Sequence, residues 1–231
     1  MRSKRIRGFL LGLLVVVSLS WAEDAPVCLL TGFQPFGEAK DNPSWEMLKP
    51  LAGQTLAGYR IETVELPVVY DEMAKPLAEA IARHRPRVVI CFGQGRGLIE
   101  VERVARNGYH AAKPPDNNGK GPPRERIVPD GPDELPTQLP VEALLAAFEK
   151  AGLAATASDN AGGYLCNECF YRLMAAKTEP GTPAPVARGF VHVPRVGEPN
   201  GTRGAFSLAD LTKAARIAVE TTIAELKQRH P

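Results

Sequence analysis

Long apolar runs and aromatic residues are both scarce in this chain. No run of 18 apolar residues occurs, and only 6% of the 231 residues are aromatic. Because a helix that crosses a bilayer needs about 20 predominantly apolar residues, an ordinary membrane span is excluded. The sequence also lacks internal repeats and a second hydrophobic core, so its length predicts one compact domain rather than two.

Excess positive charge is missing from most of the chain as well. The formal net charge of +2 becomes −2 when residues 1–22, which carry four positive and no negative charges, are set aside. This balance gives no reason to expect nucleic acid as a partner.

Residues 1–22 have the layout of a secretory signal peptide. Basic residues within positions 2–7 precede an apolar run over residues 9–19, and Ser20-Trp21-Ala22 offers small residues for cleavage after Ala22. We therefore predict a signal peptide over residues 1–22, a mature domain over residues 23–231, and a periplasmic or secreted location. An uncleaved anchor is the alternative, but the apolar run is short for one.

Fully apolar segments alternate with amphipathic segments along the mature chain. This alternation predicts a three-layer α/β/α sandwich with a mostly parallel sheet. The predicted strands cover residues 27–31, 59–66, 87–92, 153–157 and 189–194. The predicted helices cover residues 71–84, 141–151, 166–177 and 207–227, with Ser207 as the N-cap of the last. Residues 114–136 are rich in proline and glycine and are predicted to form a long loop, of a length that is often functional.

Cys166 is the strongest candidate for a nucleophile. It follows the small-residue turn 161–163 and opens a predicted helix, where unpaired N–H groups and the helix dipole favour a thiolate. The segments 31–37, 93–97 and 161–166 each follow a predicted strand. Ligands gather at the carboxyl edge of a parallel sheet, so we expect the three segments to share a pocket.

A base and an orienting acid are needed beside such a thiol. Of the four histidines, only His192 lies inside an apolar strand, where an imidazole is costly unless it is hydrogen-bonded. Glu100 and Glu102 alternate with apolar residues and face one side of a strand. The spacing alone does not choose between them.

The four cysteines also allow a redox interpretation. Cys28 and Cys91 lie in apolar runs and are predicted to be buried. Cys166 and Cys169 form a C-x-x-C pair, so a thiol–disulfide protein is an alternative, and a reversible disulfide between them would silence Cys166. No second C-x-x-C or histidine pair completes a zinc set, so we predict no metal.

Four motifs together resemble the pyroglutamyl peptidase I family, also called pyrrolidone-carboxylate peptidases. They occur in the family's order and span about residues 27–225. The motifs are Thr31-Gly32-Phe33-Gln34-Pro35-Phe36-Gly37 followed by Asn42-Pro43-Ser44-Trp45, Glu102-Arg103-Val104-Ala105 with Asn107, Ala161-Gly162 through Leu165-Cys166-Asn167, and Gly189-Phe190-Val191-His192-Val193-Pro194.

The resemblance implies a cysteine peptidase that removes N-terminal pyroglutamate from peptides without a metal or cofactor. Cys166 would be the nucleophile, His192 the general base and acid, and Glu102 the residue that orients His192. The family also implies homo-oligomers. The implied substrate-binding residues are Phe33 and Phe36 around the lactam ring, Asn42 and Gln94 as polar contacts, Tyr164 and Leu165 in the wall, and Lys113.

The chain departs from the family pattern in three places. The segment 93–97 is about two residues shorter, Lys113 stands where the family has an arginine, and Cys169 is an additional thiol. Lysine keeps the charge but lacks the planar fork of arginine. A homologue that keeps the pocket but turns over poorly is therefore a further alternative.

Overall fold

A computed structural model of the chain describes residues 25–110, 114–176 and 185–229. The predicted signal peptide and Lys113 lie outside the described residues. The strands are β1 (Val27–Phe33), β2 (Thr55–Leu56), β3 (Tyr59–Leu66), β4 (Val88–Gln94), β5 (Ile99–Glu102), β6 (Val104–Arg106), β7 (Glu134–Pro136), β8 (Ala155–Ser158) and β9 (Ala187–Val193). The helices are α1 (Pro43–Glu46), α2 (Ala74–His84), α3 (Val141–Ala151), α4 (Leu165–Ala175) and α5 (Leu208–Arg229), with a short 3-10 helix, η1 (Lys49–Leu51), after α1.

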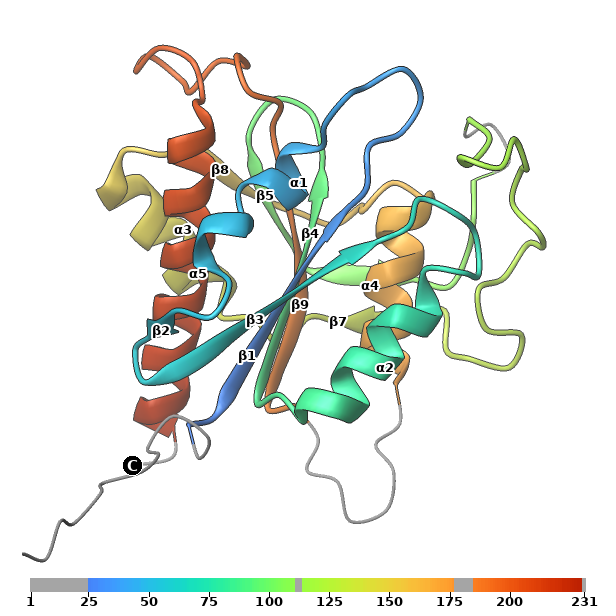
Figure 1. The fold of residues 1–231 in the computed structure, drawn as a ribbon, viewed down its shortest axis with the longest axis horizontal. Coiled ribbons are helices and arrows are strands. Elements are labelled where there is room, and N and C mark those ends of the chain that lie inside the picture. Colours follow the sequence, from blue (N-terminus) through green and yellow to red (C-terminus); the bar gives the residue numbers. More distant parts are fainter. Residues whose placement is uncertain (1–24, 111–113, 177–184, 230–231) are drawn as a thin grey trace, which may run out of the picture.

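Seven strands form one sheet in the order β2-β3-β1-β4-β9-β5-β8 (Figure 1). The central strands β3, β1, β4 and β9 are parallel to one another. β5 runs antiparallel to β9, and β8 is parallel to β5. The prediction of an α/β fold with a mostly parallel sheet is confirmed. β6 and β7 pair separately as a two-stranded ribbon.

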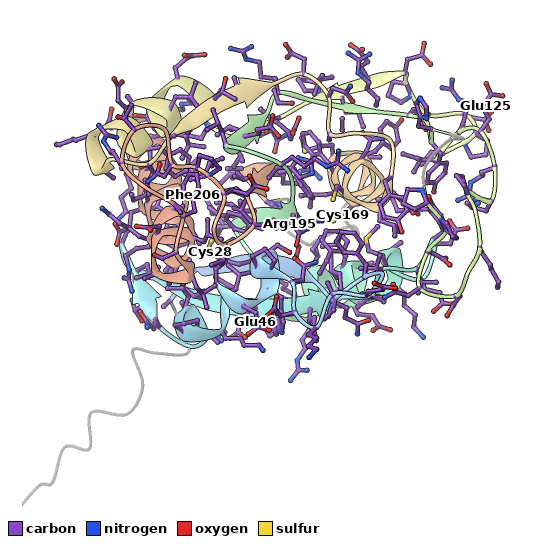
Figure 2. The ribbon with its side chains drawn as sticks, turned by 90° about the horizontal axis from the view of Figure 1, so that it is seen from above. Cys28, Glu46, Glu125, Cys169, Arg195 and Phe206 are labelled. Carbon is purple, nitrogen blue, oxygen red and sulfur yellow. The ribbon has the colours of Figure 1, made fainter. Side chains whose placement is uncertain are left out.

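Helices cover both faces of this sheet. α1, α3 and α5 lie on one face, and α2 and α4 lie on the other (Figure 1). Viewed from above, Phe206 lies beside α5 and Cys169 lies in α4, on opposite sides of the sheet (Figure 2). β1 and β4 lie between two neighbouring strands and under helices on both faces, and both are largely apolar and buried.

Three local differences separate the structure from the sequence prediction. The predicted helix 71–84 begins only at Ala74, because Asp71 has a φ of +60° and its carboxylate pairs with Arg124 and Arg172. The predicted loop 114–136 ends in strand β7. The short elements α1, η1 and β2 were not predicted.

The C-terminal helix starts as predicted. Ser207 Oγ accepts a hydrogen bond from the N–H of Asp210 at 3.1 Å, and the Asp210 carboxylate accepts one from the N–H of Ser207 at 2.9 Å. This reciprocal pair satisfies two N–H groups at the helix start, which confirms Ser207 as its N-cap.

The carboxyl ends of β1 and β4 meet at one edge of the sheet, as expected. β8, however, runs opposite to β9, so the segment 161–166 does not follow a carboxyl end at that edge. It reaches the edge through a six-residue connection from Ser158 to the first residue of α4. The three segments still converge, because α4 starts beside the end of β4 (Figure 1).

None of the helices in the described ranges has the length and hydrophobicity that a membrane crossing requires.

Candidate active site

Cys166 lies in the first turn of α4, over the end of β4. Gly162 and Gly163 precede the helix with φ values of +93° and +70°, a conformation that glycine adopts without strain. No side chain caps this helix end, so its first N–H groups remain available. A Cβ added to Gly93 would lie 2.8 Å from Cys166 Sγ, which shows how closely the thiol approaches β4.

His192 and Glu102 continue the arrangement on the same face of the sheet. His192 lies near the end of β9, and its Nδ1–H donates to Glu102 Oε1 at 2.7 Å. Glu102 is fully buried and His192 is 7% exposed. Glu100 pairs with His192 across the antiparallel strands, but the hydrogen bond goes to Glu102. The structure thus distinguishes the two glutamates that the spacing left equal.

The surroundings of His192 favour its charged form. Burial alone lowers the pKa of His192, but the negative charge of Cys166, a hydrogen bond to Cys166 and the contact with Glu102 outweigh burial and raise that pKa to about 10. The imidazole therefore joins the thiol on one side to the carboxylate on the other. A cysteine in contact with an imidazole that a carboxylate holds is the arrangement of an activated nucleophile.

A small cavity of about 50 Å³ borders Cys166. Every predicted substrate-binding residue that the structure describes lines it, and so does Val68, which the sequence analysis did not select. The lining residues are Phe33, Phe36, Asn42, Val68, Gln94, Tyr164, Leu165 and Cys166. Aromatic and aliphatic walls with a few amide groups suit a small, flat, polar-edged ligand.

Asn42 lines the cavity but has most of its amide engaged within the protein. Its Oδ1 accepts from the N–H and Oγ–H of Ser44 at 3.1 and 2.8 Å, and its Nδ2 donates to the Gln34 carbonyl at 3.0 Å. Asn42 therefore caps α1 and fixes the segment that carries Phe36. One Nδ2–H remains for a ligand, so the role that the structure gives Asn42 is chiefly to hold the cavity wall.

Residues 115–117 form a clamp that the sequence did not predict, and in it only the Asp116 side chain is buried. Asp116 is 6% exposed and accepts from the N–H of Tyr70 at 3.1 Å. Asn117 donates from Nδ2 to the Pro35 carbonyl at 2.9 Å and from its N–H to the Val68 carbonyl at 3.0 Å. The clamp joins two loops of the cavity. A Pro-Asp-Asn sequence inside a long loop was the only signal available for it.

Asn167 belongs to the motif that contains Cys166, but the sequence predicted no role for it. It is 1% exposed, and its amide makes paired hydrogen bonds with the N–H and carbonyl of Arg106 at 3.0 and 2.8 Å. It donates to the Gly108 carbonyl as well, at 2.9 Å. These bonds tie the first turn of α4, and Cys166 with it, to strand β6.

Cys169 faces away from this site. It is fully buried, and its pKa is well above the ordinary value because of burial, with a hydrogen bond to Cys91 as the next cause. All four cysteines are free thiols, and Cys28 and Cys91 are buried as predicted. A buried thiol paired with Cys91 is poorly placed to exchange disulfides with a partner, so the geometry does not favour the C-x-x-C alternative.

Within the described ranges, Glu100, Glu102 and His192 offer ligand atoms that lie within 4.8 Å of one another. A metal ion binds comparable sets of carboxylate and imidazole groups. In this set, however, Nδ1 of His192 already donates to Glu102. The hydrogen bond accounts for the closeness of Glu102 to His192, and strand pairing places Glu100 opposite His192.

A thiol, an imidazole and a carboxylate in series, beside a small apolar pocket at the edge of a mostly parallel sheet, define the class as an α/β protein with a Cys–His–Glu site. The family model described as "Pyroglutamyl peptidase" matches residues 27–225. The chain belongs to the pyroglutamyl peptidase family of enzymes, as the sequence motifs predicted.

Individual relatives agree with the family model. The chain is 39% identical over 199 residues to pyrrolidone-carboxylate peptidase of Enterobacter sp. (strain 638), covering 85% of this chain and 91% of that protein. It is 40% identical over 203 residues to pyrrolidone-carboxylate peptidase 1 of Ralstonia nicotianae, covering 86% and 93%.

Solved structures share the fold. Pyroglutamyl peptidase I of Bacillus amyloliquefaciens superposes with a TM-score of 0.77 at 38% identity, covering 86% of this chain and 97% of that one. A mutant pyrrolidone carboxyl peptidase from the hyperthermophile Pyrococcus furiosus gives 0.78 at 30% identity, covering 86% and 99%.

Proposed function

We propose that this chain removes an N-terminal pyroglutamyl residue from peptides by transferring the acyl group to Cys166. The observation that carries the proposal is the position of Cys166, which contacts His192 and borders the cavity lined by Phe33 and Phe36. Family membership gives independent support for the same substrate.

Pyroglutamate suits the cavity chemically. It has no free amine, so an enzyme must recognise it by packing a flat lactam and pairing its N–H and C=O. Phe33, Phe36 and Val68 provide apolar walls, and Gln94 provides an amide at the same cavity. A site that hydrogen-bonds the lactam carbonyl rejects proline, which lacks that group, because the polar partner would stay unpaired.

In the proposed reaction, the Cys166 thiolate attacks the carbonyl carbon of the amide bond that links pyroglutamate to the next residue. The resulting oxyanion accepts hydrogen bonds from free N–H groups in the first turn of α4. His192 donates a proton to the leaving amine, which departs as the new N-terminus, and a thioester remains. His192 then takes a proton from water, the hydroxide attacks the thioester, and pyroglutamic acid and the thiolate are released. Glu102 holds the imidazole through Nδ1.

Hydrolysis of a pyroglutamyl fluorogenic amide in the presence of reductant tests the proposal. We expect hydrolysis by the wild-type chain, none by Cys166→Ser, and none of the matching prolyl amide. No turnover between about pH 6 and 9, or turnover that survives Cys166→Ser, would overturn it. Binding of the amide without turnover would instead favour the alternative of a homologue that keeps only the pocket.

We also propose that the mature enzyme acts in the periplasm or outside the cell. The support is the basic and apolar pattern of residues 1–22 and the small residues before Glu23. Cell fractionation with N-terminal sequencing tests this, with Glu23 expected as the first residue of the exported protein. A cytoplasmic protein that retains residues 1–22 would contradict the proposal.

A further inference from the structure

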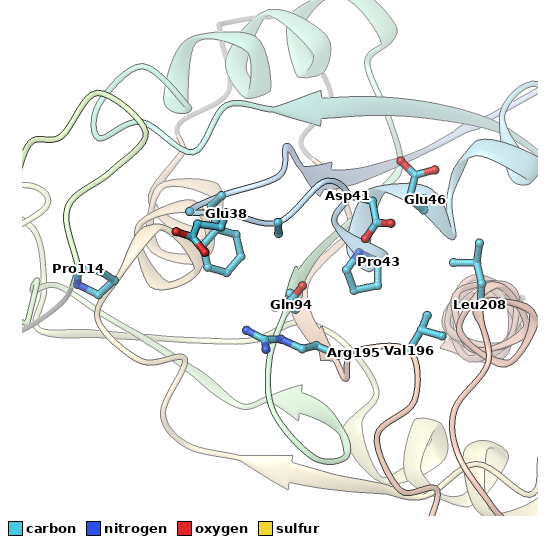
Figure 3. A pocket seen from close by; sticks show the side chains of 12 residues that line it. Glu38, Asp41, Pro43, Glu46, Gln94, Pro114, Arg195, Val196 and Leu208 are labelled. Atoms are coloured by element: carbon cyan, nitrogen blue, oxygen red, sulfur yellow. The ribbon is translucent and has the colours of Figure 1, made fainter.

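A larger cavity adjoins the pocket that Cys166 borders. Its volume is about 830 Å³, and it shares Phe36 and Gln94 with the small pocket. From these shared residues it extends along the segment before α1 to Val196 and Leu208 (Figure 3). A peptide whose first residue occupies the small pocket therefore has this groove as the continuation of its path.

The two sides of the groove carry opposite charges. Figure 3 shows Glu38 and Asp41 apart from each other on the side formed by the segment before α1, with Glu46 of α1 beside Asp41, and Arg195 on the other side. Glu46 is neutralised by Lys49 at 2.6 Å. Glu38 and Asp41 are exposed and have no ion-pair partner among the described residues. Two carboxylates that make no ion pair within the described ranges thus line one side, and Lys40, which lies between them in the sequence, does not line the cavity.

The end of the groove away from Cys166 is apolar. Val196 is 56% exposed and Leu208 is 39% exposed, and together they are two of the three exposed large hydrophobic residues in the described part of the chain. Exposed apolar side chains gathered in a concave site are typical of ligand contacts. The groove therefore offers carboxylates that attract a positive charge and apolar side chains against which the methylene groups of a long side chain can pack.

We propose that this groove holds the residues that follow pyroglutamate in a peptide substrate, and that Glu38 and Asp41 select a basic side chain among them. The inference rests on the proposed peptidase function. A Lys or Arg stem packs along Val196 and Leu208 while its charged end approaches the acidic side. Arg195, on the opposite side, faces the peptide backbone, whose carbonyls accept its hydrogen bonds.

The expected selectivity follows from the exposure of these carboxylates. Exposed ion pairs are weak individually, so two of them predict a preference of roughly three- to tenfold in kcat/KM for Lys over Glu. Screening by salt weakens such interactions, so the preference should shrink at high ionic strength.

The test compares amidated tripeptides, pyroglutamyl-X-Ala and pyroglutamyl-Ala-X, with X as Lys, Ala or Glu. Release of pyroglutamic acid is measured by chromatography at low and high salt. We expect Lys to be preferred over Glu in at least one series, and the double variant Glu38→Gln, Asp41→Asn to lose that preference. Glu79→Gln, on the exposed face of α2 away from the groove, is the matched control and should keep it.

Two results would overturn the inference while leaving the peptidase function intact. One is hydrolysis of the peptides with X as Ala, together with equal kcat/KM values for the peptides with X as Lys and X as Glu. The other is a Lys preference that persists in the double variant, which would assign selection to other residues. If none of the peptides is hydrolysed, the proposed function is overturned, and this inference with it.

Discussion

Cys166 and Cys169 lie one turn apart on α4, yet the helix presents them to opposite surroundings. Cys166 borders a cavity, contacts an imidazole and lies at an uncapped helix start. Cys169 is fully buried against Cys91. The comparison shows that burial and neighbours, rather than C-x-x-C spacing, decide what each thiol can do.

The largest expected difference between the two thiols is in catalysis. Cys166→Ala should lower kcat for a pyroglutamyl amide by at least about 10³-fold, because no other group in the site can form the thioester. Cys169→Ala should retain activity within about twofold, because its side chain does not line the cavity. Steady-state kinetics of the two purified variants checks this. Comparable losses in both would remove the distinction.

A Glu102 variant tests whether the neighbours of Cys166 activate it. Glu102→Gln should lower kcat/KM by about 10²-fold or more, because the amide no longer favours the imidazolium or fixes the imidazole tautomer. Contact with Glu102 is one of the causes that raise the pKa of His192 to about 10. Its loss lowers that pKa, so the alkaline limb of the pH–rate profile should move to lower pH.

Glu100→Gln is the matched control for this variant, because Glu100 lies on the same strand face without the hydrogen bond to His192. We expect a much smaller loss and an alkaline limb that stays in place. An equal shift in both variants would show that charge near His192, rather than the Glu102 hydrogen bond, sets the profile.

Alkylation offers a chemical version of the same comparison. Iodoacetamide should modify Cys166 about 10²-fold faster than Cys169, because the thiolate is the reactive form and burial suppresses it at Cys169. Peptide mapping by mass spectrometry of briefly treated native protein gives the two rates. Modification of Cys169 at a similar rate would mean that α4 exposes its inner face.

The smallest expected effect is on stability. Cys169→Ala removes a buried sulfur and should lower the free energy of unfolding by about 1–2 kcal/mol. For a domain of this size that corresponds to a fall in Tm of roughly 2–8 °C. Thermal unfolding followed by circular dichroism measures it, with Cys166→Ala, whose side chain is less buried, as the comparison.

Much of the fold was predictable because strands such as β1 and β4 are largely apolar runs that reach a glycine near their ends. Short or polar elements such as α1 and β7 give no comparable periodicity, so they were missed. The reversed direction of β8 was also beyond the sequence, since strand direction depends on pairing partners far along the chain. The start of α2 was predicted too early, at Asp71, because the ion pairs of Asp71 come from residues more than 50 positions away.

In the candidate site, too, residues with a local sequence signal were predicted and residues that depend on distant contacts were not. Cys166 and His192 stood out as a thiol at a helix start and an imidazole in an apolar strand. Glu100 and Glu102 were equivalent by alternation. The family motif named Glu102, and in the structure the hydrogen bond from His192 goes to Glu102. Val68 and Asp116 carry no chemical signal of their own. Their importance comes from hydrogen bonds and walls that form when distant loops meet.

The clamp made by Asn117 has a consequence for how activity first arises. Its hydrogen bond to Pro35 spans 82 positions, and the pocket also needs β9 in place beside β4. Such contacts form only after long loops have closed. A collapsed but incompletely folded chain therefore has no pocket, and the return of activity after dilution from denaturant reports the final assembly of the fold.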